Sequence, residues 1–134
     1  MGYSHDKFKS YTIFENRGYW EIQLNECENA DYVFNSVLLK IDDFLETKQL
    51  SFMMNVMYIN FEPLEFLEES WSKEEAEQRA SCFVPPDKCL AFIKDNHIIE
   101  LIEQEKPDEY EDMIQQIRVL MDYWEQGYYV CEWY

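Results

Sequence analysis

Glycine is scarce in this sequence, in which only 3 of the 134 residues are glycine. Loops that cradle phosphate groups need several glycines close together, because glycine alone lets the backbone approach the ligand so closely. A β-sandwich with many tight turns also needs more glycine than this chain has. The scarcity therefore argues against a nucleotide-binding loop and against a turn-rich sandwich.

Positive charge is scarce as well, with 11 lysine and arginine residues against 28 acidic residues and a net charge of −17. Contacts to nucleic-acid phosphates or to anionic lipids need lysine and arginine, so we expect direct binding to neither. Residues 1–25 carry three basic and three acidic side chains, so the whole negative excess falls on the remaining residues. Self-repulsion at this level lowers stability, so the charge serves either solubility or binding.

Long apolar segments are missing too. No run approaches the roughly 20 residues that a membrane span requires, and the segment GYSHDKFKS after Met1 lacks the apolar stretch of a signal peptide. The four cysteines form no C-x-x-C pair, and without an export signal we expect buried thiols rather than disulfides. These observations predict a cytoplasmic protein.

Patterns typical of enzymes and metal sites are also missing. Cys82, Cys89 and His97 could be drawn as a zinc site, but their spacings match no common zinc pattern. Cys89 and His97 would share a face of a helix as nucleophile and base, yet no glycine-containing oxyanion loop lies near them. Among 28 acids any carboxylate pair can be found, so such pairs indicate nothing. We therefore expect a non-enzymatic protein without metal or cofactor.

Apolar and aromatic residues, by contrast, are plentiful, at 47% and 17% of the chain. This content is too high for a disordered acidic tail. The length suits one domain with one core, and the chain shows neither repeats nor low-complexity linkers. We therefore expect a single globular domain over residues 1–134.

The N-terminal part of the chain predicts a hairpin, a helix and a strand. Two β-rich runs within residues 11–24 flank a turn in which Gly18 can adopt a positive φ. Apolar residues at helical spacing predict a helix over 29–47, with Asn29 as its N-cap. Residues 50–62 are apolar on both alternating faces, which favours a central strand covered on both sides.

The middle of the chain predicts two short helices. Pro63 can open a helix that runs to Trp71. Ser72 and Glu75 form a capping-box pattern for a second helix over 73–81.

The C-terminal part predicts further helices and a last strand. Residues 84–104 fit either a helix that starts at Pro86 or a hairpin, and we favour the helix. Pro107 starts a helix over 107–125, Gly127 lies where a C-terminal cap belongs, and residues 128–134 predict a strand. The sum is an α+β fold, a small mainly antiparallel sheet with three to four helices packed on it.

Carboxylates crowd the start of the 107–125 helix. Asp108, Glu109, Glu111 and Asp112 fall in its first turn or so, where the helix dipole favours acids by roughly 0.3–1 kcal/mol each. This explanation does not cover Glu100, Glu103 and Glu105, which precede the helix.

The outward faces of two predicted helices combine acids with apolar residues. These faces hold Asp108, Asp112, Gln115, Val119 and Tyr123 on one helix, and Tyr32, Asn35, Leu39, Asp43 and Glu46 on the other. Such a mixture suits a protein interface, in which aromatic anchors supply contact area and charges supply orientation. The alternative is that these residues pack against another part of the same chain.

A third acidic block surrounds Trp71. Glu65, Glu68 and Glu69 lie three and four residues apart without an intervening lysine, an arrangement that is repulsive on a helix. A cationic partner would relieve this repulsion. We therefore add Glu68, Glu69 and Trp71 to the candidate partner-binding residues.

In composition the chain resembles the small acidic immunity proteins that bacteria make against secreted toxins. The features that carry the resemblance are the acid-plus-tyrosine faces of Asp108, Asp112 and Tyr123, and of Tyr32, Asp43 and Glu46. The resemblance covers the whole chain at the level of a class, without a motif. It implies an inhibitor that occludes the basic active-site cleft of a toxin nuclease.

Two other functions remain open. A nucleic-acid mimic would inhibit a DNA- or RNA-binding defence or regulatory protein, but mimics space their carboxylates like phosphates and need few aromatic anchors. The clustered acids and many aromatics of this chain favour a compact plug over a mimic. An adaptor or regulatory subunit is the third possibility.

Overall fold

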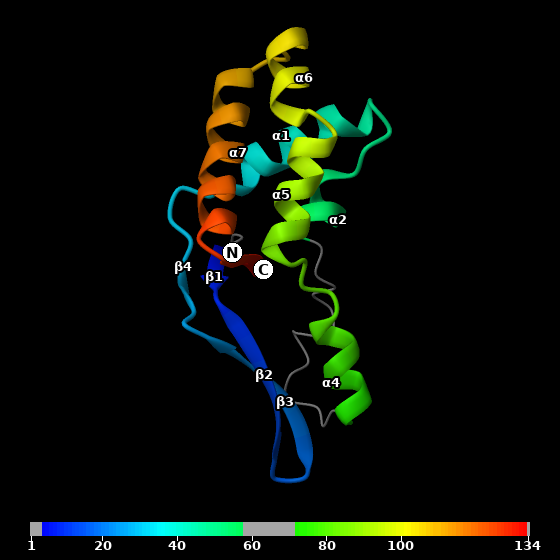
Figure 1. The fold of residues 1–134 in the computed structure, drawn as a ribbon, viewed down its shortest axis with the longest axis vertical. Coiled ribbons are helices and arrows are strands. Elements are labelled where there is room, and N and C mark those ends of the chain that lie inside the picture. Colours follow the sequence, from blue (N-terminus) through cyan, green and yellow to red (C-terminus); the bar gives the residue numbers. More distant parts are fainter. Residues whose placement is uncertain (1–3, 58–71, 134) are drawn as a thin grey trace.

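The computed structural model describes residues 4–57 and 72–133, and within them the chain forms helices and two small antiparallel sheets. The helices gather at one end of the molecule, while a β-hairpin projects from the other end with one helix beside it (Figure 1). The α+β class expected from the sequence is confirmed.

The projecting hairpin consists of β2 (Ser10–Asn16) and β3 (Tyr19–Asn25). Asn16 pairs with Tyr19, so the turn contains only Arg17 and Gly18. Their φ angles are 53° and 89°, the positive values that a two-residue turn of type I′ requires. The predicted hairpin is therefore confirmed, together with the role of Gly18.

The second sheet joins the two ends of the chain (Figure 1). Its central strand β1 (Ser4–Phe8) pairs with β4 (Glu28–Asn29) on one side and with β5 (Tyr129–Trp133) on the other. Both pairings are antiparallel. The predicted C-terminal strand is therefore confirmed.

Helix α1 (Asn35–Glu46) is shorter than the predicted helix over 29–47. Asn29 lies in β4 rather than at a helix N-cap, and the N-cap of α1 is Phe34. The chain turns at Tyr32, whose φ of 65° is left-handed and incompatible with a continuous right-handed helix. The end of the predicted helix was right and its start was wrong.

Helix α2 (Phe52–Val56) contradicts the strand predicted over 50–62. One carboxylate oxygen of Asp42 in α1 accepts hydrogen bonds from the backbone N–H groups of Phe52 and Met53, both at 3.1 Å. These bonds satisfy two N–H groups that a first helical turn leaves without partners. Residues 50, 51 and 57 are not in a strand either, and residues 58–62 of the predicted strand and the helix predicted over 63–71 lie outside the described residues.

Helix α4 (Lys73–Ala80) begins with the capping box predicted from the sequence. The Ser72 hydroxyl oxygen accepts from the Glu75 N–H at 3.1 Å, and the Ser72 N–H donates to the Glu75 carboxylate at 3.3 Å. The helix packs against the hairpin, as Figure 1 shows.

Residues 84–104 are helical, as favoured over a hairpin, but they form two helices instead of one. Helix α5 (Pro86–Asp95) starts at the predicted proline, and α6 (Ile98–Glu105) follows after a break at His97, where φ is 50°. The left-handed conformation of His97 redirects the chain between the two helices.

Helix α7 (Tyr110–Glu125) carries the longest apolar stripe of the described chain and ends before Gly127, whose φ is 88°. Its start lies after the predicted Pro107, because Glu109 has a left-handed φ of 61°. Asp108 and Glu109 therefore precede the helix, and Glu111 and Asp112 are the acids of its first turn.

The buried apolar residues that the structure describes form two clusters. The helical cluster lies among α1, α2, α5, α6 and α7 and is centred on residues such as Leu38, Ile117 and Trp124. The hairpin cluster consists of Phe8, Ala80, Phe83 and Cys131, with residues of β2 and β3 packed against it. None of the helices within residues 4–57 and 72–133 has the length and apolar character of a membrane span.

Candidate partner-binding surface

A hollow of about 550 Å³ opens between α7 and the loop that precedes α1. We call it the Tyr32 hollow, and its lining residues are Tyr32, Phe34, Val37, Asp112, Gln115, Gln116 and Val119. Its walls come from segments about 80 residues apart in the sequence, so it exists only in the folded protein.

Two aromatic side chains of this hollow are unusually exposed. Tyr32 is 73% exposed and Phe34 is 56% exposed, and they are neighbours in the same loop. Single exposed apolar residues are common on protein surfaces. Two large ones beside an apolar hollow form the kind of patch that marks an interaction site.

The buried side chain of Gln116 holds the loop against α7. Its amide oxygen accepts a hydrogen bond from the Phe34 N–H at 2.8 Å, and its amide nitrogen donates to the Tyr32 carbonyl at 3.0 Å. The side chain is 2% exposed, so both bonds lie in a region where leaving either group unpaired would be costly. The exposed aromatics are therefore attached to a fixed backbone.

Tyr123, one turn beyond the hollow, holds the other end of this loop. Its hydroxyl donates to the Asp31 carbonyl at 2.7 Å, and the ammonium group of Lys7 lies 4.6 Å from the centre of its ring. Partial burial, together with the negative charge of Asp31, raises the pKa of Tyr123, so its hydroxyl keeps its proton and remains a donor. Tyr123, expected to contact a partner, thus supports the loop that carries Tyr32.

A second hollow, which we call the Asp108 hollow, lies at the start of α7 and measures about 810 Å³. It is lined by Lys40, Asp43, Phe44, Pro107, Asp108, Glu109 and Met113. Lys40 in α1 forms a salt bridge with Glu109 across this hollow. Asp43 and Asp108, which the sequence placed on the outward faces of two different helices, both line this hollow.

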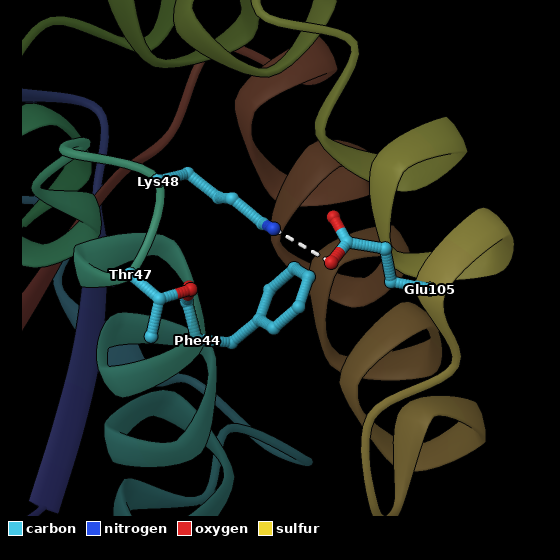
Figure 2. Close-up of polar contacts among 4 residues, drawn as sticks. All are labelled: Phe44, Thr47, Lys48 and Glu105. Atoms are coloured by element: carbon cyan, nitrogen blue, oxygen red, sulfur yellow. Dashed lines mark hydrogen bonds and ion pairs between the residues drawn. The ribbon is translucent and has the colours of Figure 1, made fainter.

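One part of the acidic run is neutralised within the chain. Figure 2 shows Lys48, just beyond α1, reaching Glu105 at the end of α6, with 2.6 Å between the ammonium nitrogen and the carboxylate oxygen. The ammonium group also lies 5.7 Å from the centre of the Phe44 ring, and the hydroxyl of Thr47 donates to the Phe44 carbonyl at 2.6 Å. Glu105, which the helix dipole did not explain, therefore has a structural role.

The structure divides the residues predicted from the sequence into groups. Tyr32, Asp112 and Val119 meet at the Tyr32 hollow, whereas Asp43 and Asp108 meet at the Asp108 hollow. Glu46 lies apart, in a small depression between α1 and α2. Glu68, Glu69 and Trp71 lie outside the described residues.

Sequence reasoning missed Phe34, Val37 and Gln116 as lining residues. Phe34 and Val37 fit the core stripe of the predicted helix, and only the later start of α1 exposes Phe34. Gln116 offered a signal, because it is a polar residue next to the core residue Ile117 in an otherwise apolar stripe. Such a position usually indicates a buried hydrogen-bonding role.

The thiol considered as a nucleophile is unsuited to that role. Cys89 is fully buried and its thiol lies 3.3 Å from the Val56 carbonyl, while His97 is exposed. Burial, with a contribution from Asp87, raises the pKa of Cys89 to about 12, so its thiolate is scarcely populated near neutral pH. Across residues 4–57 and 72–133 no cluster of three or more histidine, cysteine or acidic side chains is arranged to hold a metal ion.

Comparisons of the chain with protein-family models, with curated proteins and with solved structures give no match.

Proposed function

We propose that this protein is an acidic inhibitor that binds a basic protein partner in the cytoplasm and blocks it by occupying its cationic cleft. The type of partner that fits best is a toxin nuclease, which makes the chain an immunity protein. The observation that carries the proposal is the pair of exposed aromatics, Tyr32 and Phe34, fixed beside Asp112 on a chain of net charge −17.

The fixed loop favours tight binding. Aromatic side chains at the centre of an interface supply much of its binding free energy. Because Gln116 and Tyr123 already hold the backbone of residues 31–34, little conformational freedom is lost when a partner docks. The surface is thus organised before binding.

The charge favours fast and selective binding. A net charge of −17 attracts a cationic partner over distances set by the salt concentration and repels acidic proteins. The proposal requires no reaction at the surface, since a nuclease is inhibited once its substrate cleft is filled. A DNA- or RNA-binding defence protein would be attracted in the same way, and the experiment separates the two partners.

The test starts with affinity capture from a nuclease-treated lysate of the native organism across a salt series, followed by an activity assay of the captured protein. We expect one stoichiometric basic protein whose nuclease activity is lost when this chain is added. Tyr32→Ala and Phe34→Ala should each weaken binding roughly 30-fold, the effect of losing about 2 kcal/mol at an interface anchor. Met54→Ala is the matched control, because Met54 is 61% exposed but lies in α2, away from the hollow.

Other results would contradict the proposal in distinct ways. Several nucleic-acid-binding proteins released by added DNA would identify a mimic. A captured protein whose activity is unchanged would identify an adaptor. The absence of any salt-sensitive partner would leave the acidic surface with a solubilising role alone.

A further inference from the structure

We propose that the Tyr32 hollow receives a single apolar side chain of the protein partner, and that a lysine or arginine beside it in the partner's chain pairs with Asp112. This inference rests on the proposed function, because it takes the partner to be a basic protein. It adds which side chains of that partner the surface recognises.

The lining of the hollow selects an apolar occupant. Val37 and Val119 face it from the two helices, and Phe34 faces it from the loop. The one buried polar side chain of the lining, Gln116, has its amide oxygen and its amide nitrogen bonded to the loop backbone. An entering aliphatic or aromatic group therefore covers apolar surface without separating this amide from its partners.

The charge beside the hollow selects a cationic neighbour for that occupant. Asp112 is exposed, and within residues 4–57 and 72–133 the ion pairs involve other acids, namely Glu105, Glu109 and Glu132. An acid at the rim of an apolar hollow loses part of its hydration when the hollow is filled. A lysine or arginine of the partner restores a favourable environment for it.

The Asp108 hollow extends the preference for a cationic partner along the surface. The Tyr32 hollow uses Phe34 and Val37 near the start of α1, and the Asp108 hollow uses Lys40, Asp43 and Phe44 in the next turns. Lys40 forms its salt bridge with Glu109. The hollow therefore keeps the negative charges of Asp43 and Asp108. A further cation in the partner segment therefore finds attraction on the side of the Asp108 hollow.

The same charges disfavour the other possible occupants. A second copy of this chain carries the same net charge of −17 and is repelled. A neutral apolar molecule of small size would fill the hollow but leave Asp112 partly dehydrated and unpaired. A basic protein segment with an apolar anchor is the occupant that satisfies both features.

The test is a two-dimensional NMR titration of the isotopically labelled protein with three capped hexapeptides at fixed salt. The first peptide has one tryptophan followed closely by two arginines, the second has alanine for tryptophan, and the third has glutamate for both arginines. We expect the first to shift the amide signals of Phe34, Val37 and Val119 and the other two to bind at least tenfold more weakly. That pattern requires both the apolar anchor and the cations.

Two matched variants assign the cation site. Asp112→Lys should weaken binding of the first peptide about tenfold. Glu111→Lys makes the same change of charge in the same first turn of α7, but Glu111 does not line the hollow. It should leave the affinity within about twofold of the original protein.

Specific outcomes of these experiments would contradict the inference. Equal binding of the tryptophan and alanine peptides, or shifts centred on α4, would overturn insertion into this hollow. Equal effects of the two charge variants would overturn the pairing of the partner's cation with Asp112. Equal binding of the glutamate peptide would overturn the cation pairing with Asp112. In each case a basic nuclease captured and inhibited by the protein would leave the proposed function intact. Insertion confirmed without any inhibited partner would overturn the function alone.

Discussion

The helical end of the molecule and the hairpin end are held together by cores of very different size. Among residues 4–57 and 72–133, seventeen buried residues form the helical cluster and four form the hairpin cluster. The smaller one depends on ring contacts, since Phe8 stacks on Tyr129 at 4.9 Å and meets the edge of Phe83 at 5.0 Å. Burial of apolar surface is the main favourable term in folding, so the two ends should differ in local stability.

Charge is distributed in the same unequal way. Hairpin residues 10–25 carry Arg17 against Glu15 and Glu21, so they contribute little to the net charge of −17. At the helical end, α1, α5, α6 and α7 together carry twelve acidic and four basic side chains, and the larger core offsets their mutual repulsion. The Tyr32 hollow also lies on this end, with Val37 and Val119 packed against the helical cluster. The end with the larger described core therefore carries the candidate binding surface.

The largest effect is expected from Ile117→Asp. Ile117 is fully buried in the helical cluster, and a carboxylate there would have no compensating partner within hydrogen-bonding reach of that apolar site. The free-energy cost of several kcal/mol is comparable with the roughly 5–15 kcal/mol that stabilises a whole domain. Circular dichroism should therefore show global unfolding.

Ala91→Asp is the control for this change. Ala91 is exposed on α5, so the variant adds the same negative charge without burying it, and it should remain folded. A folded Ile117→Asp protein would mean that the helical cluster is less essential than its burial indicates.

A smaller and local effect is expected from Phe83→Ala. Phe83 is 6% exposed and contacts both Phe8 and Tyr11, with ring centres 5.0 and 5.5 Å apart. Removing a buried phenylalanine side chain costs about 3–5 kcal/mol. We expect amide hydrogen exchange to speed up in β2, β3 and α4 while α1, α5 and α7 keep their protection.

Phe14→Ala is the matched control, because Phe14 lies in β2 at the same end of the molecule but is not among the described residues of the hairpin cluster. Its effect on exchange should be clearly smaller. If Phe83→Ala instead lowered protection equally at both ends, the molecule would unfold as one cooperative unit and the contrast between the cores would carry no consequence for stability.

Elements with local signals were predictable from the sequence. The hairpin followed from a turn that needs Gly18, α4 from the Ser72 and Glu75 capping box, and most of α7 from its apolar stripe. Each signal involves residues close together in the chain, so no tertiary contact was needed to interpret it.

Elements decided by distant contacts were not predictable. A short apolar run is equally compatible with a buried strand and a buried helix, and at residues 52–56 the side chain of Asp42 in α1 favours the helix. The start of α1 depends on the left-handed Tyr32, whose carbonyl is bonded to Gln116 from 84 residues further along the chain. No residue near Tyr32 in the sequence predicts that contact.

The candidate surface was predictable to the same extent. Tyr32, Asp112 and Val119 were found from outward helical faces, which require only the period of the helix. The sequence could not show that they surround one hollow, because that follows from the packing of the 32–34 loop on α7. It also could not show that Tyr123 supports this loop through a hydrogen bond to the Asp31 carbonyl.

The smallest effect, and the finest test of the comparison, is expected from replacing two glycines. Gly18 in the hairpin turn and Gly127 at the end of α7 have nearly equal φ angles of 89° and 88°. Among the described residues, an added Cβ would meet nothing within 4 Å at Gly18 and only the Lys9 ammonium nitrogen at 3.8 Å at Gly127. Alanine at either position should therefore cost roughly 1–2 kcal/mol through backbone strain alone.

The equal strain should act on different parts of the molecule. Gly127→Ala should lower the free energy of global unfolding measured by denaturant, because it strains the end of a helix in the larger core. Gly18→Ala should chiefly speed hydrogen exchange in β2 and β3. Asparagine, which tolerates a left-handed φ, should restore most of the loss at both positions. Equal losses of global stability from the two alanine variants would show that the hairpin does not open independently of the helices.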